Sequence, residues 1–448
     1  MQRSAIFARD LYRDYPVITR GEGVYIYDQQ GKRYLDASGG SNASVPIGHG
    51  VPEVIEAMVA QAQKITFVPM HYFLSEPVQQ FAEAVAAITP PGLNKVWFVS
   101  GGSEATENAI KLARQYHLER GEGSRYKIIS RWQSFHGNTL GALAASGHTY
   151  RRSKYLPMLK DFPHIPPANP YRCWFGKECP RCNLECAHIL EAVIRQEGPE
   201  SIAAFMAEPI VGATTGATVP PDGYFAVIRE ICDRYGVLLI ADEVQTGFGR
   251  TGKYFCLEHW NVIPDIITVA KGMSGGYTPL GAVIASEKVL EPFLQNRTNF
   301  VGGHTYSGNP LSCAVGMAVL QYIQQHKLVE KAAVQGAYLL ASLRERLADA
   351  PSVGEVRGRG LMVGIEFVRN RETKDPYPPE ARFSARVTAE AADRGAIVYP
   401  GTGTADGLQG DHILLTPPYI ISREEIDELV GILVEAIATT EAAYPPQG

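Results

Sequence analysis

Hydrophobic and polar positions alternate along this chain in two patterns. Short runs of consecutive apolar, often β-branched residues indicate strands buried on both faces. These runs predict strands at residues 95–99, 127–130, 202–206, 237–241, 266–270 and 279–286. Longer segments with apolar residues three or four positions apart indicate helices. They predict helices at residues 52–65, 76–88 and 224–235, and one after Ser103 with Ala105, Ala109, Leu112 and Tyr116 on its buried face.

The order of these elements divides the chain into two kinds of region. Strands and helices alternate between residues 50 and 328, which predicts a parallel or mostly parallel sheet with helices on both faces. After residue 329 the strands are shorter, at 361–367 and 412–415, and a polar loop is expected at 369–379. We expect an α/β fold with a large domain at 51–328. Residues 329–448 are expected to form a smaller α/β domain together with residues 1–50.

Composition excludes several classes of protein. The 448 residues are 45% hydrophobic and 20% charged with a formal net charge of −5, which is ordinary for a globular chain. We expect no nucleic-acid partner, because there is no basic excess. We expect no membrane span, because no apolar run approaches the roughly 20 residues that cross a bilayer. Residues 1–10 are too mixed for a secretion signal, so a cytoplasmic location is expected.

The seven cysteines fall into two groups. Three stand singly in apolar surroundings and are expected to be buried: Cys232, Cys256 and Cys313. Four lie within 14 residues: Cys173, Cys179, Cys182 and Cys186. Their spacing is compatible with a zinc or iron–sulfur site, but loop thiols can have the same spacing. The question of a metal stays open, and we assign no metal ligand.

Four polar residues stand where predicted strands end. They are Ser100, Glu208, Asp242 and Lys271. The carboxyl ends of parallel strands border the ligand crevice of such sheets, so these side chains are expected to converge. A lysine beside a buried strand loses its proton more easily than a solvated one and can form an imine with a carbonyl group. Taken alone, a lysine in this position more often simply returns to solvent.

The turn from Ser100 to Ser103 joins a strand to a helix. Its glycines leave backbone amides free at the helix N-terminus, where a phosphate binds well, although an ordinary helix cap is the alternative. A phosphate site, a buried carboxylate and a lysine together favour pyridoxal 5′-phosphate as the cofactor. Lys271 would hold its aldehyde as an imine, Asp242 would pair with its ring nitrogen, and Gly101, Gly102 and Ser103 would hold its phosphate. Asp242 alone could be a strand-end carboxylate or a metal ligand.

Several motifs resemble those of a known family. They are SGGSEATENA at 100–109, FHG at 135–137, ADEVQTGFGRTG at 241–252, AKG at 270–272, GGHTYSGNP at 302–310 and RGRGL at 357–361. With them, nearly the whole chain resembles the class III (ω-amino) aminotransferases, which belong to fold type I of the pyridoxal phosphate enzymes. The resemblance implies a large domain with a mostly parallel seven-stranded sheet and a smaller α/β domain.

The resemblance also implies roles for individual residues. Lys271 and Asp242 are implied to be catalytic. The implied cofactor-binding residues are Gly102 and Ser103 at the phosphate, Phe135 and Val244 on the two faces of the ring, Gln245 at the ring hydroxyl, and His136 and Glu208 nearby. Thr305 is implied to reach the phosphate of the neighbouring subunit. This implies a homodimer with shared active sites, with a tetramer left open.

The implied reaction moves an amino group from an amine or ω-amino acid to an oxo acid of the pyruvate or 2-oxoglutarate class. Donor and acceptor react in turn, in a ping-pong scheme, and Lys271 moves the proton. A racemase or phospholyase on the same fold would keep Lys271, Asp242 and the phosphate site. A metal-binding regulatory protein on an inactive scaffold is a further alternative, which the intact Lys271 and Asp242 disfavour.

The chain departs from the family at one pair of positions. In relatives that act on 4-aminobutyrate or ornithine, a glutamate five residues after the position of Glu208 pairs with an arginine near the C-terminus. Here the first position is Ala213, and residues 401–421 contain no arginine. We therefore expect amines or longer ω-amino acids to be preferred over 4-aminobutyrate. Arg151 or Arg152 could still bind the acceptor's carboxylate, but the sequence does not locate that residue.

Overall fold

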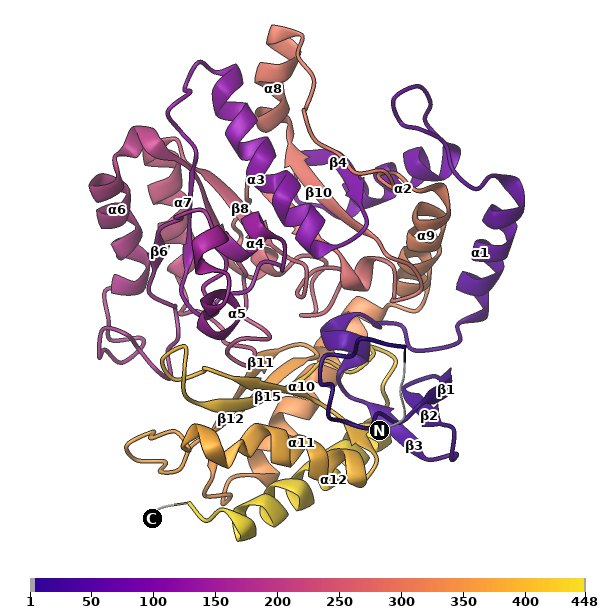
Figure 1. Ribbon diagram of the computed structural model, residues 1–448, viewed down its shortest axis with the longest axis vertical. Helices are drawn as coiled ribbons and strands as arrows, with labels where there is room; N and C mark the ends of the chain where they lie inside the picture. Colours follow the sequence, from indigo (N-terminus) through magenta and orange to yellow (C-terminus); the bar gives the residue numbers. More distant parts are fainter. Residues whose placement is uncertain (1–4, 447–448) are drawn as a thin grey trace.

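The computed structural model describes residues 5–446, with an upper part built on a large sheet and a lower part built on two small sheets (Figure 1). Residues 1–4, on which the expectation about a secretion signal partly rests, lie outside the described residues. The large sheet has seven strands. In spatial order they are β4 (Leu93–Val99), β10 (Gly281–Ser286), β9 (Ile266–Val269), β8 (Leu238–Asp242), β7 (Ile202–Ala207), β5 (Lys127–Arg131) and β6 (His164–Ile165).

Only β10 runs against its neighbours in the large sheet. It pairs antiparallel with β4 and β9, and the other neighbouring pairs are parallel. The mostly parallel α/β sheet expected from the alternation of elements is therefore confirmed. The two-residue strand β6 was not predicted, because two residues are too few to show a period.

Helices cover both faces of this sheet. One core lies under α2 (Glu76–Ile88), α6 (Glu185–Glu197), α7 (Tyr224–Tyr235) and α9 (Pro310–Gln325). The opposite core lies under α3 (Gly102–Glu119), α4 (Leu140–Ala145) and α8 (Glu287–Asn296). In β8, Leu239 and Ala241 belong to the first core, and Leu238 and Ile240 belong to the second. This double burial explains why the strand reads as a continuous apolar run, and each buried leucine stabilises the fold by about 1.5–3 kcal/mol.

The lower part contains the two small sheets and three long helices. One sheet has the order β11 (Val353–Arg359), β12 (Met362–Phe367), β15 (Asp411–Leu415) and β14 (Tyr399–Thr402). The other has the order β1 (Ile18–Glu22), β2 (Tyr25–Asp28), β3 (Arg33–Asp36) and β13 (Ala396–Ile397). A shared core joins these sheets to α10 (Leu328–Arg346), α11 (Phe383–Asp393) and α12 (Arg423–Ala443).

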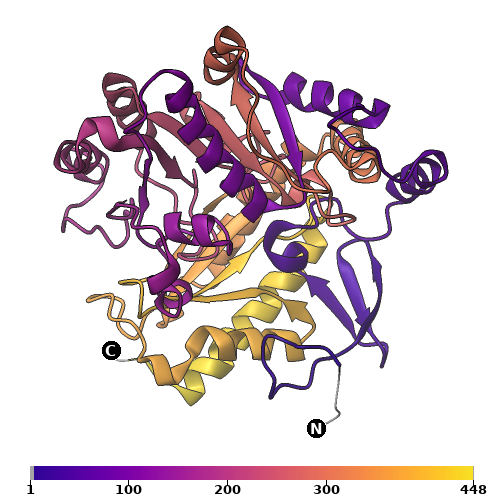
Figure 2. The same ribbon diagram turned by 45° about the horizontal axis from the view of Figure 1, so that its top comes forward.

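The N-terminal strands lie beside the C-terminal part of the chain in both ribbon views (Figures 1 and 2). The contact is direct, because β3 pairs in parallel with β13, matching Leu35 with Ala396 and Asp36 with Ile397. On this basis we propose that residues 1–50 and 329–448 form one small domain beside a large domain of residues 51–328.

The remaining helices are short or peripheral. They are α1 (Pro52–Lys64), α5 (Thr149–Ser153) and the single-turn helices Leu156–Met158, Pro199–Ser201, Cys256–Trp260, Lys271–Met273 and Pro379–Ala381, with a π turn at Gly39–Ala43. No helix in the described part of the chain has both the length and the apolar character needed to cross a membrane.

Candidate active site

A buried carboxylate stands at the end of β8. Asp242 is 4% exposed, and its Oδ2 lies 2.7 Å from Nδ1 of His136. Its Oδ1 accepts hydrogen bonds from the backbone N–H of Val244 at 3.1 Å and from Oγ1 of Thr268 at 3.3 Å. A carboxylate can accept about four hydrogen bonds, so these contacts fix its orientation and leave room for one more donor.

A second buried carboxylate, Glu208, follows β7. Its Oε1 accepts from the backbone N–H of Phe135 at 2.9 Å, and its Oε2 accepts from the backbone N–H of Gly212 at 3.3 Å. Burial raises the pKa of Glu208 above its ordinary value. The side chain ties the loop after β5 to the loop after β7, and so it sets the position of Phe135.

Lys271 follows β9 and starts a single-turn helix that ends at Met273. Its φ is +47°, in the left-handed region that residues other than glycine rarely adopt. Such a backbone costs about 1–3 kcal/mol and occurs mainly where function requires it. The preceding strand is fully buried, and Lys271 itself is half-buried.

The surroundings of Lys271 favour its neutral form. Burial lowers the pKa of its amine from 10.5 to about 8, against the opposing effect of the Asp242 and Glu208 carboxylates. The guanidinium groups of Arg250 and Arg151 lower this pKa further. A neutral amine is the form that attacks a carbonyl group, so the site prepares Lys271 as a nucleophile.

The turn between β4 and α3 provides an anion site. The first amides of α3 have no partner one turn earlier in the helix, and the helix dipole is positive there. Gly102 packs so closely that an added Cβ would lie 2.9 Å from Cγ1 of Val244. Oγ of Ser103 accepts from the backbone N–H of Asn138 at 3.0 Å and keeps its own proton for a ligand.

Gln245 presents an unsatisfied acceptor. Its Oε1 is buried and has no hydrogen-bond partner in the described chain. Gly212 leaves the room for this amide, because a Cβ there would lie 1.6 Å from Oε1. A buried acceptor without a partner is costly, so the position fits a ligand hydroxyl.

The pieces fit pyridoxal phosphate. Gln245 would take the ring hydroxyl, Asp242 the ring nitrogen, and the α3 amides with Ser103 the phosphate. Phe135 is half-buried, and the Arg151 guanidinium carbon lies 4.5 Å from the centre of its ring. A stacked pyridine would therefore take the other face of Phe135.

Thr305 follows His304, whose Nδ1 lies 3.7 Å from Oε1 of Glu104 in the first turn of α3. It is exposed on the segment between α8 and α9 and makes no contact with Asp242 or Ser103 in the described chain. The other predicted site residues lie at the ends of strands of the large sheet or in the segments that directly follow them. Thr268 was not predicted, although a hydroxyl inside an apolar strand two residues before Ala270 was a signal that could have found it.

The departure from the family is visible in space. Nε2 of His412, on β15, lies 3.2 Å from the carbonyl oxygen of Ala213, and its Nδ1 lies 2.5 Å from Oγ1 of Thr404. Burial and then the charge of Arg357 lower the pKa of His412 to about 3. The side chain is therefore neutral at physiological pH and cannot replace the missing arginine.

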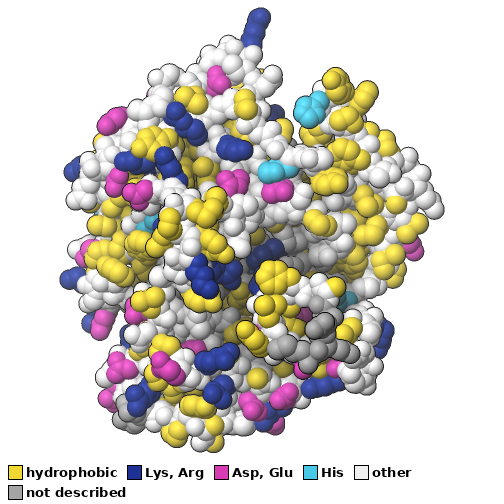
Figure 3. All heavy atoms as spheres, in the orientation of Figure 1, with side chains coloured by type: hydrophobic (Ala, Val, Ile, Leu, Met, Phe, Trp, Pro, Cys, Tyr) yellow, Lys and Arg dark blue, Asp and Glu magenta, His cyan; other side chains and the backbone are white. Residues whose placement is uncertain are grey.

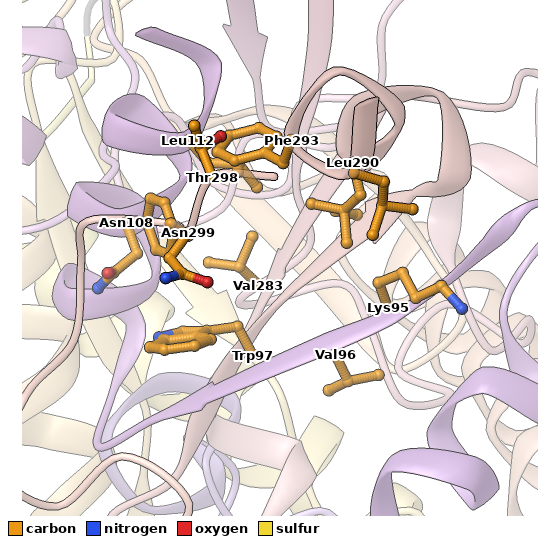
Figure 4. Close-up of a pocket in the computed structure, with 13 residues that line it drawn as sticks. Lys95, Val96, Trp97, Asn108, Leu112, Val283, Leu290, Phe293, Thr298 and Asn299 are labelled. Carbon is orange, nitrogen blue, oxygen red and sulfur yellow. The ribbon is translucent and has the colours of Figure 1, made fainter. Parts of the chain in front are cut away.

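Two hollows in the surface differ in the residues that line them. One, of about 440 Å³, is lined by Arg151, Ala213, Tyr399 and neighbours. Figure 3 shows Lys and Arg side chains gathered in the hollow between the upper and lower parts, where α5 lies in Figure 1. The other, of about 260 Å³, is apolar and lies between β4, α3 and α8, with Trp97 and Val283 in its wall (Figure 4). The wall of the second hollow contains none of the residues around Asp242, whereas the wall of the first includes Asn138, whose backbone N–H donates to Oγ of Ser103.

The cysteines behave as two groups. Cys232, Cys256 and Cys313 are fully buried, as predicted. The other four line a cavity of about 10 Å³, and Sγ of Cys179 and Cys182 are 3.6 Å apart. Burial raises the pKa of Cys179 to about 11 and that of Cys186 to about 12, so these thiols hold their protons. Within residues 5–446, no three His, Cys, Asp or Glu side chains are arranged to hold a metal ion.

Comparisons with known proteins agree with this geometry. The family model for class-III aminotransferases matches residues 7–437. The uncharacterized aminotransferase YodT of Bacillus subtilis is 39% identical over 98% of both chains. A thermostable (S)-enantioselective ω-transaminase from Thermomicrobium roseum is 40% identical, covers 96% of this chain and 92% of its own, and has a TM-score of 0.88. A PLP-bound amine transaminase from an uncultivated Pseudomonas species is 34% identical over 98% of both chains, with a TM-score of 0.90.

Proposed function

The chain belongs to the class-III aminotransferase family, and on this premise we propose that its donors are amines or ω-amino acids longer than 4-aminobutyrate. The enzyme is pyridoxal phosphate-dependent, has the fold type I architecture, and transfers amino groups between small molecules. The comparisons give no support to the racemase or phospholyase alternative. The donor class is the part of the function that is our proposal.

One observation carries the donor proposal. In relatives that have the glutamate–arginine pair, the arginine can bind a carboxylate of the substrate. At the corresponding place this chain has Ala213 and the buried, neutral His412. The carboxylate of a donor such as 4-aminobutyrate finds no charged partner in these two residues. The desolvation of that carboxylate would then count against binding. Amines without a carboxylate avoid this penalty.

We also propose the roles of the site residues. When bound, pyridoxal phosphate supplies an electron sink for the carbon that carries the amino group. Asp242 holds a proton on the ring nitrogen, and His136 and Thr268 hold Asp242 in place. Lys271, neutral above about pH 8, takes a proton from the substrate carbon and returns it to the accepting carbon.

Other residues position the reactants. The α3 amides, with Gly102 and Ser103, bind the phosphate, and Phe135 and Val244 enclose the ring. Gln245 accepts from the ring hydroxyl, because its Oε1 has no other partner in the described chain. Glu208 acts through Phe135, whose backbone it binds at 2.9 Å.

Assembly and location belong to the same proposal. Thr305 is exposed and its side chain makes no hydrogen bond in the described chain, which suits a residue that completes the site of a second copy. We propose a homodimer with shared active sites, acting in the cytoplasm on an amine donor and an oxo acid acceptor.

A matched pair of donors tests the donor proposal. Butylamine and 4-aminobutyrate have the same carbon chain and differ only by the carboxylate, and 6-aminohexanoate moves that carboxylate further away. With pyruvate as acceptor, we expect kcat/KM for butylamine and 6-aminohexanoate to exceed that for 4-aminobutyrate. A strong preference for 4-aminobutyrate over butylamine would overturn the proposal.

A further inference from the structure

Arg151 is an arginine without an acidic partner beside the reaction site. It lies on α5, half-buried, with its guanidinium carbon 4.5 Å from the centre of the Phe135 ring. Its Nη2 lies 3.3 Å from the Tyr399 hydroxyl, which is a long hydrogen bond. Within residues 5–446, no carboxylate lies at ion-pair distance from Arg151. A guanidinium offers five donors, so most of those on Arg151 remain free for a ligand.

Arg9 also lines this hollow, and two further neighbouring arginines, Arg152 and Arg250, are engaged elsewhere. Arg152 is buried, with Nη1 3.2 Å from Nε2 of His164 and its guanidinium 5.2 Å from the Trp132 ring. Arg250 is fully buried, and its Nη1 donates to the carbonyl oxygens of Leu361 at 2.9 Å and Pro417 at 2.6 Å. Neither side chain lines the hollow that contains Arg151. The choice between Arg151 and Arg152, which the sequence left open, therefore falls on Arg151.

The hollow itself is suited to an anion. Its volume is about 440 Å³, and its wall includes Arg151, Lys154, Ala213 and Tyr399. Ala213 stands where a glutamate would neutralise a nearby guanidinium. His148, also in the wall, has its pKa lowered to about 4 by burial and by Arg151, so it is neutral and adds no competing charge.

The hollow adjoins the chemistry through shared residues. Phe135, under Arg151, is tied to Glu208, and the charge of Arg151 is one of those that act on Lys271. An acid bound to Arg151 would thus lie next to Phe135, on whose other face the cofactor ring would stack. Two parallel N–H donors of a guanidinium match the two oxygens of a carboxylate.

We propose that Arg151 binds the carboxylate of the oxo acid acceptor, in place of the arginine that this chain lacks near its C-terminus. The inference rests on the proposed function of the site and extends it. Arg151 is a specificity-determining residue: it favours acceptors that carry a carboxylate. The half-reaction of a simple amine does not use it. Tyr399 holds the guanidinium when no acid is bound.

The two half-reactions separate this role from the rest of the enzyme. Apoenzyme loaded with pyridoxamine phosphate is mixed with pyruvate, and cofactor absorbance reports the rate in a single turnover. The pyridoxal phosphate form is mixed with butylamine in a parallel experiment. Arg151→Gln and Arg151→Met remove the charge, and the methionine keeps an apolar stem over Phe135. Lys154→Gln, an exposed cation in the same wall, is the matched control.

We expect both Arg151 variants to raise the apparent Kd for pyruvate by about 10–100-fold, the value of a charge-assisted hydrogen bond or two. The butylamine half-reaction and the Lys154→Gln variant should change by less than about 3-fold. An unchanged pyruvate Kd would overturn the proposal. Equal losses in both half-reactions would also overturn it, because Arg151 would then act through Phe135. If wild-type enzyme fails with butylamine but reacts with pyruvate, the donor proposal fails and the test of Arg151 still stands.

Discussion

Nδ1 of His136 lies 2.7 Å from Oδ2 of Asp242, and both side chains are almost completely buried. His136 comes from the loop after β5, and Asp242 ends β8. The contact therefore joins the loop after β5 to the end of β8 at the carboxyl edge of the large sheet. It fixes one oxygen of the carboxylate and leaves the other to Val244 and Thr268, so one acceptor position remains for a further donor. The site is built around a carboxylate that cannot rotate.

Asp242→Asn tests the charge of that carboxylate. The amide keeps the size of the side chain but cannot hold a proton on a ring nitrogen. We expect both half-reactions to slow by about 10²–10³-fold, the usual effect of removing one preorganised electrostatic group. Asp161→Asn, at an exposed carboxylate, should leave the rates unchanged. Single-turnover absorbance gives both values, and a normal rate in Asp242→Asn would exclude the assigned role.

His136→Asn tests the support of the carboxylate. The shorter side chain loses the 2.7 Å contact but removes no charge from the ring nitrogen's partner. We expect a smaller loss of kcat, about 10-fold, because one hydrogen bond to a charged group is removed. The informative result is whether His136→Asn lowers kcat less than Asp242→Asn does. A loss larger than that of Asp242→Asn would mean that His136 acts on the substrate itself.

The lowered pKa of Lys271 predicts a pH dependence. Because burial brings its pKa to about 8, the apoenzyme should react with pyridoxal phosphate at half its maximal rate near pH 8. The sign for stability follows from proton binding. Between about pH 8 and 10.5 the unfolded chain holds a proton on this lysine and the folded chain does not. The unfolding free energy of the apoenzyme should therefore rise with pH in this window, relative to Lys271→Met.

Rates of cofactor reaction and urea unfolding at a series of pH values check both statements. A rate that rises only above pH 10 would show that the amine is solvated. The same conclusion would follow if wild type and Lys271→Met had parallel stability profiles.

Gly212→Ala tests the space around Gln245. A Cβ at this position would lie 1.6 Å from Oε1 of Gln245, so the amide must move away from the ring hydroxyl. We expect the Kd for pyridoxal phosphate to rise about 10-fold, as for one lost hydrogen bond. Gly431→Ala is the control, because a Cβ there meets nothing within 4 Å and replaces a glycine inside α12. Fluorescence titration with the cofactor measures the Kd of both variants. If Gly212→Ala and Gly431→Ala bound pyridoxal phosphate equally well, Gln245 would not contact the cofactor.

Parts of this structure follow from local pattern alone. The helices at α2 and α7 and the buried strand β8 were predicted within a residue or less, because their apolar periods are strong and Gly236 marks the end of α7. The convergence of Glu208, Asp242 and Lys271 follows from one rule, that parallel strands present their carboxyl ends at the same edge.

Other parts depend on contacts that no local pattern contains. The antiparallel direction of β10 is set by its pairing with β4, which lies about 180 residues earlier in the chain. The left-handed backbone of Lys271 has no sequence signal, since glycine is the residue that usually marks this conformation. Likewise, Arg151 and Arg152 are adjacent in sequence, and only the packing of α5 shows that one faces the hollow and the other the interior.

The attachment of the cofactor to Lys271 is the claim on which the account rests, and borohydride reduction of the holoenzyme tests it directly. Reduction makes the link between amine and cofactor permanent, and digestion followed by mass spectrometry locates the added mass. We predict that one peptide carries the label and that fragmentation places it on Lys271. A label on another lysine, or no label on a protein with bound pyridoxal phosphate, would contradict the account.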